Sequence, residues 1–421
     1  MRTETQETTQ KKKGRKALRV VLWLILILLV AAGAAAGYAY RTYNKTLEAL
    51  EVTFTDDAPR VDVGGTYATM DYVSSYVGEI TPSAEYFDAD TVGDKEVTFT
   101  VTHPLFGGLL NPTRDFTLRY SVIDTIPPLA LWTGDGALIG QGSAFNINDV
   151  IAYGDNADPE PVVAVEGEVD TDTLGEYPLH VTVTDASGNA TDWWLTVEVV
   201  DSFPEYVDDT PRTPFADFVA AYAGEGRVFG IDVSSWQGDV DYEAVKAAGC
   251  DFVIIRIGFS IDGEVTLDNT FEQNFRDARA AGLRVGLYLY SYDSTEEQVR
   301  GAADWIIERL DGAELDLPVA FDWEDFGDFQ SYKMSFLTLN RLYDAFEDEL
   351  AGAGYDCMLY GSKNYLEKIW EDTDTRPVWL AHYTDWSSYA GPYMIWQVSN
   401  LGNIDGIYAD VDMNILFEEN E

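Results

Sequence analysis

Three patterns of apolar and polar residues follow one another along the chain. A continuous apolar run at residues 17–40 has no charged residue between Arg19 and Arg41, and it exceeds the ~20 residues that a helix needs to cross a bilayer. Residues 50–201 then contain short stretches in which apolar and polar residues alternate, as in half-buried β-strands. From Val228 onward, short apolar runs alternate with amphipathic helical segments. The pattern predicts a multidomain chain with an N-terminal transmembrane helix, a β region and an α/β region.

The β region contains an internal repeat. Asp88–Gly93 is similar to Asp170–Gly175, and each segment leads into an alternating strand, a loop and a second strand. A repeat of short strands ~80–100 residues long is typical of immunoglobulin-like β-sandwiches. We therefore predict two such domains, at residues 50–125 and 126–201.

The second of these domains resembles the immunoglobulin-like repeats of bacterial surface proteins. The resemblance rests on residues of a strand–turn–strand hairpin, which are Tyr177, Val181, Val183, Asp185, Gly188 and Asn189. Nothing in either domain suggests catalysis. We expect both to be spacers that hold the C-terminal domain away from the membrane, and wall binding is the alternative.

The C-terminal region contains eight apolar runs that predict buried strands, at residues 228–233, 252–257, 284–289, 318–323, 356–360, 377–381, 393–398 and 409–413. Helical segments lie between several of them, at residues 242–248, 271–281, 295–310 and 335–351. Repeated alternation of strands and helices predicts a parallel β/α barrel at residues 227–421. Residues 202–226 contain three prolines and a short helical stretch, and we expect them to be a linker.

The charge distribution narrows the range of partners. The chain has 73 acidic and 27 basic residues and a net charge of −46, although its 46% hydrophobic content is ordinary for a globular protein. Residues 1–45 hold nine of the basic residues and only two of the acidic ones. The remainder is strongly acidic, which repels nucleic acid and anionic lipid but not a neutral glycan. We therefore expect no nucleic-acid partner.

Residues 1–16 form a basic tail before the apolar run. Basic residues on this side place the tail in the cytoplasm and everything after Arg41 outside the cell. A secreted protein, released by signal cleavage near Ala34–Ala36, is the alternative. Gly33 and Gly37 match a pattern for pairing of membrane helices, which alone is little support for a dimer.

The two cysteines, Cys250 and Cys357, each precede a predicted strand. Buried free thiols are the simpler expectation, and a disulfide outside the cell is the alternative. The chain has three histidines and no Cys–His cluster, so the sequence predicts no metal site and no cofactor.

Acidic residues lie at the ends of three predicted strands, where the catalytic residues of such barrels are found. Asp232 closes the first strand, Asp322 and Glu324 close the fourth, and Asp412 lies in the last. Because residues i and i+2 of a strand point to the same face, Asp322 and Glu324 should project together. Their proximity should raise one pKa and leave one carboxyl protonated near neutral pH. A glycosidase needs such an acid and a second carboxylate to support an oxocarbenium-like centre.

Residues 227–417 resemble glycoside hydrolase family 25, the lysozymes of the Chalaropsis type. The resemblance rests on motifs in the family's order and spacing, including Gly-Ile-Asp-Val-Ser-Ser-Trp-Gln-Gly at 230–238, with others at 252–258, 274–282, 285–291, 322–324, 359–362, 379–383, 395–398 and 411–414. It implies a flattened TIM-like α/β barrel that cleaves the β-1,4 bond between N-acetylmuramic acid and N-acetylglucosamine in peptidoglycan.

The same resemblance implies a role for each acidic residue. Glu324 would be the general acid, and Asp322 beside it would hold the substrate's N-acetyl group or the developing positive charge. Asp232 and Asp412 would complete the cluster. Whether Asp322 is a nucleophile stays open. The alternatives are a catalytically inactive wall-binding surface protein and a barrel glycosidase that acts on another N-acetylated glycan.

Aromatic residues near the strand ends are candidates for stacking on sugar rings. They are Tyr288, Tyr290, Tyr383, Trp396 and Trp236. Arg256, near the end of the second strand, either orients a carboxylate or forms a structural ion pair. His382 and Val398 depart from the residues common in the family, which puts substrate detail in more doubt than activity.

Overall fold

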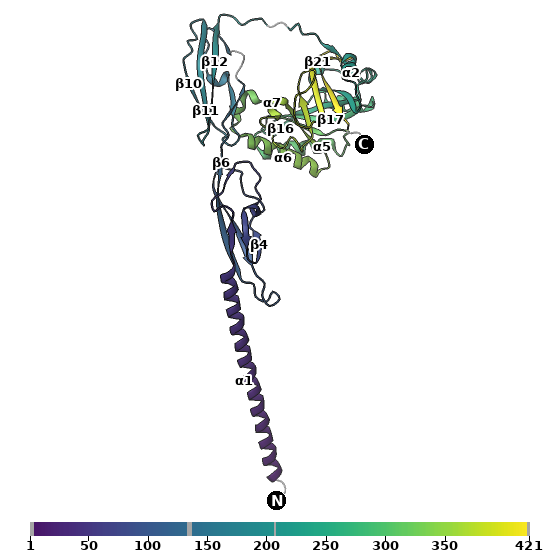
Figure 1. Ribbon diagram of the computed structural model, residues 1–421. Helices are drawn as coiled ribbons and strands as arrows, with labels where there is room; N and C mark the ends of the chain where they lie inside the picture. The colour runs from purple at the N-terminus through teal and green to yellow at the C-terminus, as the bar shows by residue number, and fades with distance from the viewer. Residues whose placement is uncertain (1–3, 133–136, 206–207, 419–421) are drawn as a thin grey trace. The chain divides into compact units, whose positions relative to one another are not determined.

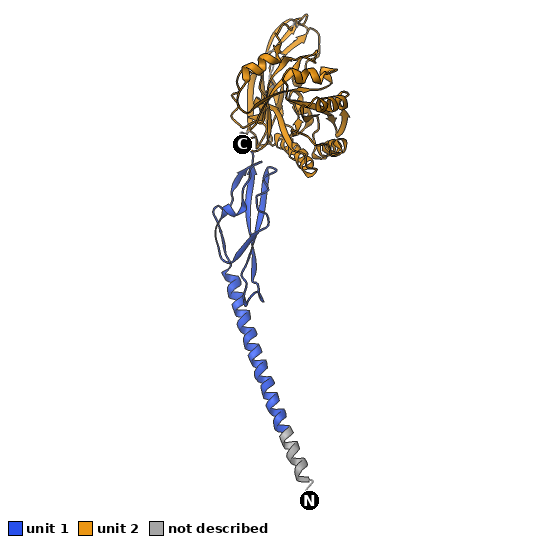
Figure 2. Ribbon diagram, turned by 90° about the vertical axis from the view of Figure 1, so that its right-hand side faces the viewer, with its two compact units in different colours: residues 1–124 blue, residues 125–421 orange. Residues whose placement is uncertain are grey.

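The computed structural model describes residues 4–132, 137–205 and 208–418. Residues 1–3 of the predicted basic tail lie outside this description. The chain divides into two compact units, residues 1–124 and 125–421 (Figure 2).

The N-terminal helix α1 spans Glu4–Ala49 (Figure 1). It is longer than the predicted span of 17–40, because the polar residues that flank the apolar run continue the helix at both ends. The stretch Arg15–Ala49 is long and apolar enough to cross a membrane, a test that a signal sequence also passes.

The first unit continues with six strands: β1 (Val52–Phe54), β2 (Arg60–Asp62), β3 (Val73–Tyr76), β4 (Glu79–Pro82), β5 (Gly93–Thr102) and β6 (Thr113–Ile123). One sheet has the order β2-β6-β5-β4, and β1 pairs with β3. The hairpin β5–β6 buries alternate residues of β5, namely Val97, Phe99 and Val101, as its period of two predicts.

The second repeat has a corresponding set of strands: β7 (Leu129–Trp132), β8 (Ala137–Gly140), β9 (Ala152–Gly154), β10 (Val162–Glu166), β11 (Gly175–Thr184) and β12 (Ala190–Val200). One sheet has the order β10-β11-β12-β8, and β7 pairs with β9. β11 begins at Gly175 as β5 begins at Gly93, and the two strands alternate buried and exposed residues identically.

Eight strands of the second unit form a closed ring, here called the barrel: β14 (Arg227–Val233), β15 (Phe252–Ile261), β17 (Arg284–Ser291), β18 (Val319–Asp322), β19 (Cys357–Ser362), β20 (Val378–Ala381), β21 (Ile395–Asn403) and β22 (Val411–Phe417). The prediction of a wholly parallel barrel is wrong in its last strand, because β22 runs antiparallel to both β14 and β21. Residues 404–410 are too few for the crossover that a parallel partner requires.

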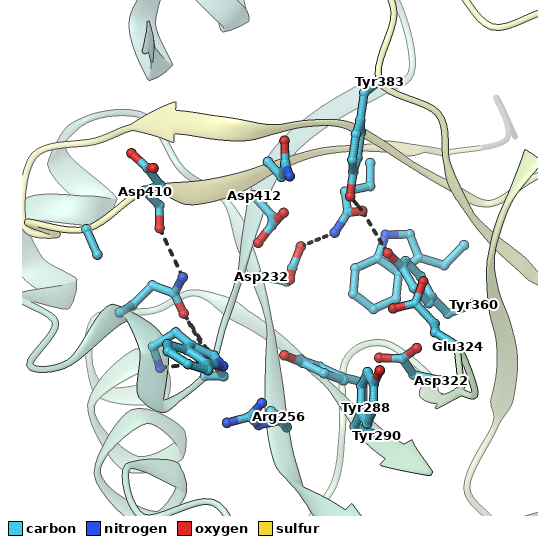
Figure 3. A pocket seen from close by; sticks show the side chains of 17 residues that line it. Asp232, Arg256, Tyr288, Tyr290, Asp322, Glu324, Tyr360, Tyr383, Asp410 and Asp412 are labelled. Carbon is cyan, nitrogen blue, oxygen red and sulfur yellow. Dashed lines mark hydrogen bonds between the residues drawn. The ribbon is translucent and has the colours of Figure 1, made fainter. Parts of the chain in front are cut away.

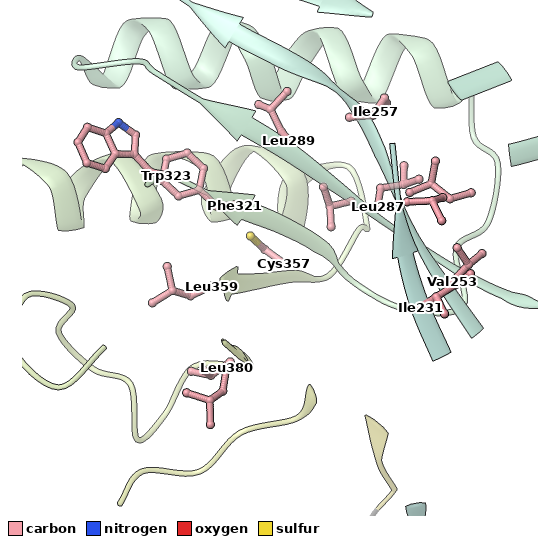
Figure 4. Close-up of a cluster of buried hydrophobic side chains, with 14 of the residues drawn as sticks. Ile231, Val253, Ile257, Leu287, Leu289, Phe321, Trp323, Cys357, Leu359 and Leu380 are labelled. Carbon is pink, nitrogen blue, oxygen red and sulfur yellow. The ribbon is translucent and has the colours of Figure 1, made fainter. Parts of the chain in front are cut away.

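Helices cover the outer face of the barrel: α3 (Tyr242–Ala247), α4 (Phe271–Ala280), α5 (Glu296–Leu310), α6 (Phe336–Gly352) and α7 (Lys363–Leu366). Side chains that point outward from the strands, including Ile231, Val253, Leu287 and Phe321, form the main apolar core (Figure 4). Cys250 and Cys357 are free, buried thiols.

Part of the predicted linker belongs to the barrel. The strand β13 (Thr213–Pro214) pairs with β21, and the helix α2 (Phe215–Tyr222) follows it. Phe215 and Phe218 are buried in the main core. The two phenylalanines lie three residues apart and therefore on one face of the helix. This apolar face explains why the segment packs against the main core and is not a free linker. A further short strand, β16 (Glu264–Leu267), pairs with the end of β15 and was not predicted.

Within the second unit, the second repeat packs against the loop that follows β18. This loop forms the short helix η4 (Phe326–Tyr332). The backbone N–H of Phe336 donates to the carbonyl of Asp155 at 2.8 Å, and that of Leu337 donates to Asn156 at 3.1 Å. Gly154 lies directly against the rings of Phe329 and Phe336.

Replacing Gly154 with alanine is therefore expected to lower the free energy of unfolding by about 1–3 kcal/mol, the usual cost of overpacking. A Cβ atom at this position would lie 2.6 Å from Phe329 and 2.7 Å from Phe336. Denaturant unfolding measures the change. Gly301→Ala on α5 is the control, because no described atom lies within 4 Å of its Cβ position and alanine favours a helix. Equal stability of Gly154→Ala and the wild type would contradict the packing described.

Candidate active site

A pocket with a volume of about 480 Å³ opens at the carboxyl ends of the parallel strands. All four acidic residues predicted from the sequence line it, and so do five of the other candidates (Figure 3): Trp236, Arg256, Tyr288, Tyr290 and Tyr383. Segments far apart in the sequence thus bring these side chains to one mouth of the barrel.

The interior of the barrel has an apolar half and a polar half. Phe252, Ile254 and Met358 belong to the apolar core that fills the first half. Two residues further along these strands, the inward side chains are Arg256 and Tyr360, which line the pocket. The period of two in a strand keeps them on the same face. On the antiparallel β22 the order is reversed, so Asp412 precedes the apolar Leu416.

Asp232 lies at the centre of the polar half. It is paired directly with Asp412 across β14 and β22, which places the two Cβ atoms about 4.5–5.5 Å apart. Its Oδ2 accepts hydrogen bonds from Gln397 Nε2 at 3.0 Å and from Asn414 Nδ2 at 2.7 Å. These two donors stabilise the charged form of a carboxylate that burial would otherwise disfavour.

A second layer of hydrogen bonds fixes the two amides. The hydroxyls of Tyr360 and Tyr383 each donate to Gln397 Oε1 at 2.9 Å, and Trp379 Nε1 donates to Asn414 Oδ1 at 2.8 Å. Because each amide oxygen receives a donor, each amide nitrogen faces Asp232. Gln397, Asn414 and Tyr360 were not among the predicted site residues, although polar residues at inward positions of buried strands could have indicated them.

Asp322 and Glu324 occupy the end of β18. Trp323 between them is fully buried in the main core, where its Nε1 donates to the carbonyl of Asp293 at 3.0 Å. Its neighbours on either side therefore point into the pocket, as the alternation predicts. Among the described residues, none donates a hydrogen bond to the buried Asp322 Oδ1. This buried oxygen is therefore an unsatisfied acceptor at the end of β18.

Burial is the main cause of the raised pKa values of the four carboxyls. The pKa of Asp232 is raised to about 6. Burial, and then the charge of Asp232, raises the pKa of Glu324 to about 7 and that of Asp412 to about 9. The pKa of Asp322 lies well above its ordinary value because of burial and the charges of Glu324 and Asp232. The cluster therefore retains protons at neutral pH.

Arg256 forms the structural ion pair that was one of its two expected roles. Its guanidinium lies 2.7 Å from the carboxylate of Asp268, whose side chain is fully buried. It also donates to Ser235 Oγ at 2.8 Å, so it holds the short helix η3 (Ser235–Gln237). Trp236 on that helix is 80% exposed, which leaves its ring open to solvent at the rim of the pocket.

The structure places Trp396 away from the pocket. It is 5% exposed and packs in the main core. Its ring lies edge-on to Tyr222, with 5.6 Å between the ring centroids, and its Nε1 donates to the carbonyl of His382 at 2.8 Å. The sequence analysis grouped it with the groove aromatics because it lies near a strand end. Its neighbour Gln397 has the inward position, so Trp396 points outward.

A second cavity of about 430 Å³ adjoins the first. Three residues line both cavities: Glu324, Tyr360 and Tyr383. The two cavities thus adjoin along a shared wall. Together they are here called the groove, and separately the acidic lobe and the Lys363 lobe. The remaining residues of the Lys363 lobe are Ser362, Lys363, Asn364, Ala381 and His382. Glu324 lies at the junction.

Residues 231–407 match the family model for glycosyl hydrolases family 25. Residues 130–199 match the model for the Ig-like domain of bacterial surface proteins. Both resemblances seen in the sequence are thereby confirmed.

The chain is similar to several known proteins over the same region. It is 29% identical to the autolytic lysozyme of Clostridium acetobutylicum over 189 residues. This aligned region covers 44% of this chain and 54% of that protein. It is 27% identical to lysozyme M1 of Streptomyces globisporus over 206 residues. This aligned region covers 46% of this chain and 68% of that protein. The solved structure of the autolysin LytC of Streptococcus pneumoniae with a synthetic peptidoglycan ligand matches with 21% identity and a TM-score of 0.42, covering 56% of each chain. The chain spans about half the length of the clostridial relative.

Proposed function

We propose that the protein is a cell-wall lysozyme that hydrolyses the β-1,4 bond between N-acetylmuramic acid and N-acetylglucosamine. The observation that carries this proposal is the pair Asp322 and Glu324, one buried and one partly buried carboxyl, which have raised pKa values and line an open groove. The family match and the relatives named as lysozymes support the same substrate class. No metal or cofactor has a role in the proposed reaction.

Glu324 is the general acid in this mechanism. With a pKa of about 7, it holds a proton in a substantial fraction of molecules at neutral pH, and its place between the lobes suits an oxygen that joins two sugars. It donates the proton to the bridging oxygen as the C1–O bond breaks. A water molecule then adds to C1, and its proton returns to Glu324.

The other acids support the positive charge that develops at C1. Asp322, whose Oδ1 is free, lies closest in sequence to the acid and holds either the N-acetyl group or the charge itself. Asp232 is kept as an anion by Gln397 and Asn414. Asp232 also helps Glu324 to keep its proton, because the charge of Asp232 raises the pKa of Glu324.

The dependence of kcat/KM on pH is expected to be bell-shaped, with its maximum between about pH 6 and pH 7. Activity falls below about pH 6 as Asp232 gains a proton, and above about pH 7 as Glu324 loses one. Asp232→Asn should also move the alkaline limb to lower pH, because its charge raises the pKa of Glu324. Initial rates across the range measure both effects. An alkaline limb that stays in place in Asp232→Asn would contradict the coupling.

The remaining parts of the chain hold the enzyme at its substrate. α1 anchors the protein in the membrane, with its N-terminus in the cytoplasm, and the β repeats act as spacers. Leu22, Trp23 and Leu28 are all more than half exposed on this helix, and a helix that is apolar all round requires a membrane or a core.

Retention of the protein in membranes after alkaline carbonate washing is expected. A soluble chain that begins near residue 37 would instead identify a signal peptide. Pairing of α1 through Gly33 and Gly37 stays a prediction.

Release of soluble fragments from purified, dye-labelled peptidoglycan tests the proposed function. The lysozyme should release dye in proportion to time and enzyme concentration. A surface protein with an inactive barrel would sediment with the wall and release nothing. Activity on chitin oligomers alone would favour a glycosidase for another N-acetylated glycan.

A further inference from the structure

The two lobes of the groove differ in charge. The acidic lobe contains Asp232, Asp322, Asp410 and Asp412, and the carboxylate of Asp232, which Gln397 and Asn414 keep charged, repels an anionic group. The Lys363 lobe, on the other side of Glu324, contains one lysine and one histidine. Burial and the neighbouring Lys363 lower the pKa of His382, so this imidazole is neutral at neutral pH and Lys363 carries the positive charge of the lobe.

The ammonium group of Lys363 is available to a ligand. It lies 2.7 Å from the Glu367 carboxylate, but both side chains are partly exposed, at 25% and 33%. Such pairs between successive helical turns contribute little stability, and an ammonium group has three donors. Arg256, the cation of the acidic lobe, differs because its partner Asp268 is fully buried. Of the described cations that line the groove, Lys363 is the one that can exchange its partner at little cost.

We propose that Lys363 binds a carboxylate on the muramic acid branch of the glycan strand. This inference rests on the proposed function. The carboxylate has two possible sources, the attached peptide and, where the peptide has been removed, the lactyl group itself. Both place an anion on alternate sugars of an otherwise neutral strand. An anion excluded from the acidic lobe and bound beyond Glu324 would fix how the strand lies across the catalytic pair.

Three forms of peptidoglycan strand test the proposal: strands with peptides, the same strands with their carboxyl groups amidated, and strands freed of peptide. Lys363→Met is compared with Lys368→Met, an exposed lysine of the next turn that lies outside the lobe. We expect Lys363→Met to lower kcat/KM about 10-fold on carboxylate-bearing strands, mainly through KM, as loss of one charged hydrogen bond does. On amidated strands it should equal the wild type. Lys363→Arg should retain most of the activity, which separates charge from folding.

Comparison of the three substrates also identifies the source of the carboxylate. A loss on strands with peptides assigns the peptide carboxylate, and a loss confined to peptide-free strands assigns the lactyl group. Equal activity of Lys363→Met and the wild type on both, or an equal loss on amidated strands, would overturn the proposal. If the wild type cleaves none of the three, the proposed function itself fails, and this inference with it.

Discussion

Replacing Glu324 with glutamine is expected to lower kcat by at least ~10²–10⁴-fold, the usual contribution of a general acid. Glutamine has nearly the same size but cannot donate a proton to the bridging oxygen. The substitution also removes a carboxyl that burial and Asp232 make costly to ionise. Stability should therefore be unchanged or higher, and substrate should still bind.

The rate of fragment release from peptidoglycan, measured beside thermal unfolding, tests this prediction. Glu308→Gln is the matched control, because it makes the same change at an exposed position of α5. It should keep the wild-type rate. A Glu324→Gln variant that clears walls as fast as the control would show that another residue supplies the proton.

Replacing Asp322 with asparagine is expected to lower kcat by about 10²–10³-fold, as the loss of one preorganised group that stabilises transition-state charge does. Asp322 is 4% exposed, and its buried Oδ1 receives no hydrogen bond from the described residues. Asparagine fills the same space but can never ionise. Asp322 can ionise more readily once Glu324 is protonated, because one of the charges that raise its pKa is then absent, and an oxocarbenium-like centre requires that negative charge. KM should change much less than kcat, since the charge develops only in the transition state.

Steady-state kinetics on soluble glycan strands separate these effects. Asp304→Asn, exposed on α5, is the control for the change in charge. A rise in KM with kcat unchanged would assign Asp322 to ground-state binding and would contradict its place in the reaction.

The order of elements in the barrel could be predicted from the sequence because its strands are buried on both faces. Runs such as residues 252–257 and 284–289 are almost wholly apolar, and β15 and β17 include them completely. The direction of β22 was missed because apolar content does not reveal strand direction. The length of the connection at residues 404–410 was the available signal.

The acidic residues could be predicted because each lies where a buried strand ends. Gln397 and Asn414 were missed, because they act through Asp232 and only the closed ring brings them to it. Their polar side chains within buried strands were the available signal. Trp396 was misplaced for a related reason. Its position near a strand end does not determine which face it takes, and that face follows from the inward position of Gln397.

The identity of the sugar at the new reducing end is the measurement on which the proposed reaction depends. Products of the wild-type protein, reduced with borohydride and analysed by mass spectrometry, should end in reduced N-acetylmuramic acid, and Glu324→Gln should yield almost none. Products that end in reduced N-acetylglucosamine, or intact strands beside a fully folded protein, would contradict a muramidase.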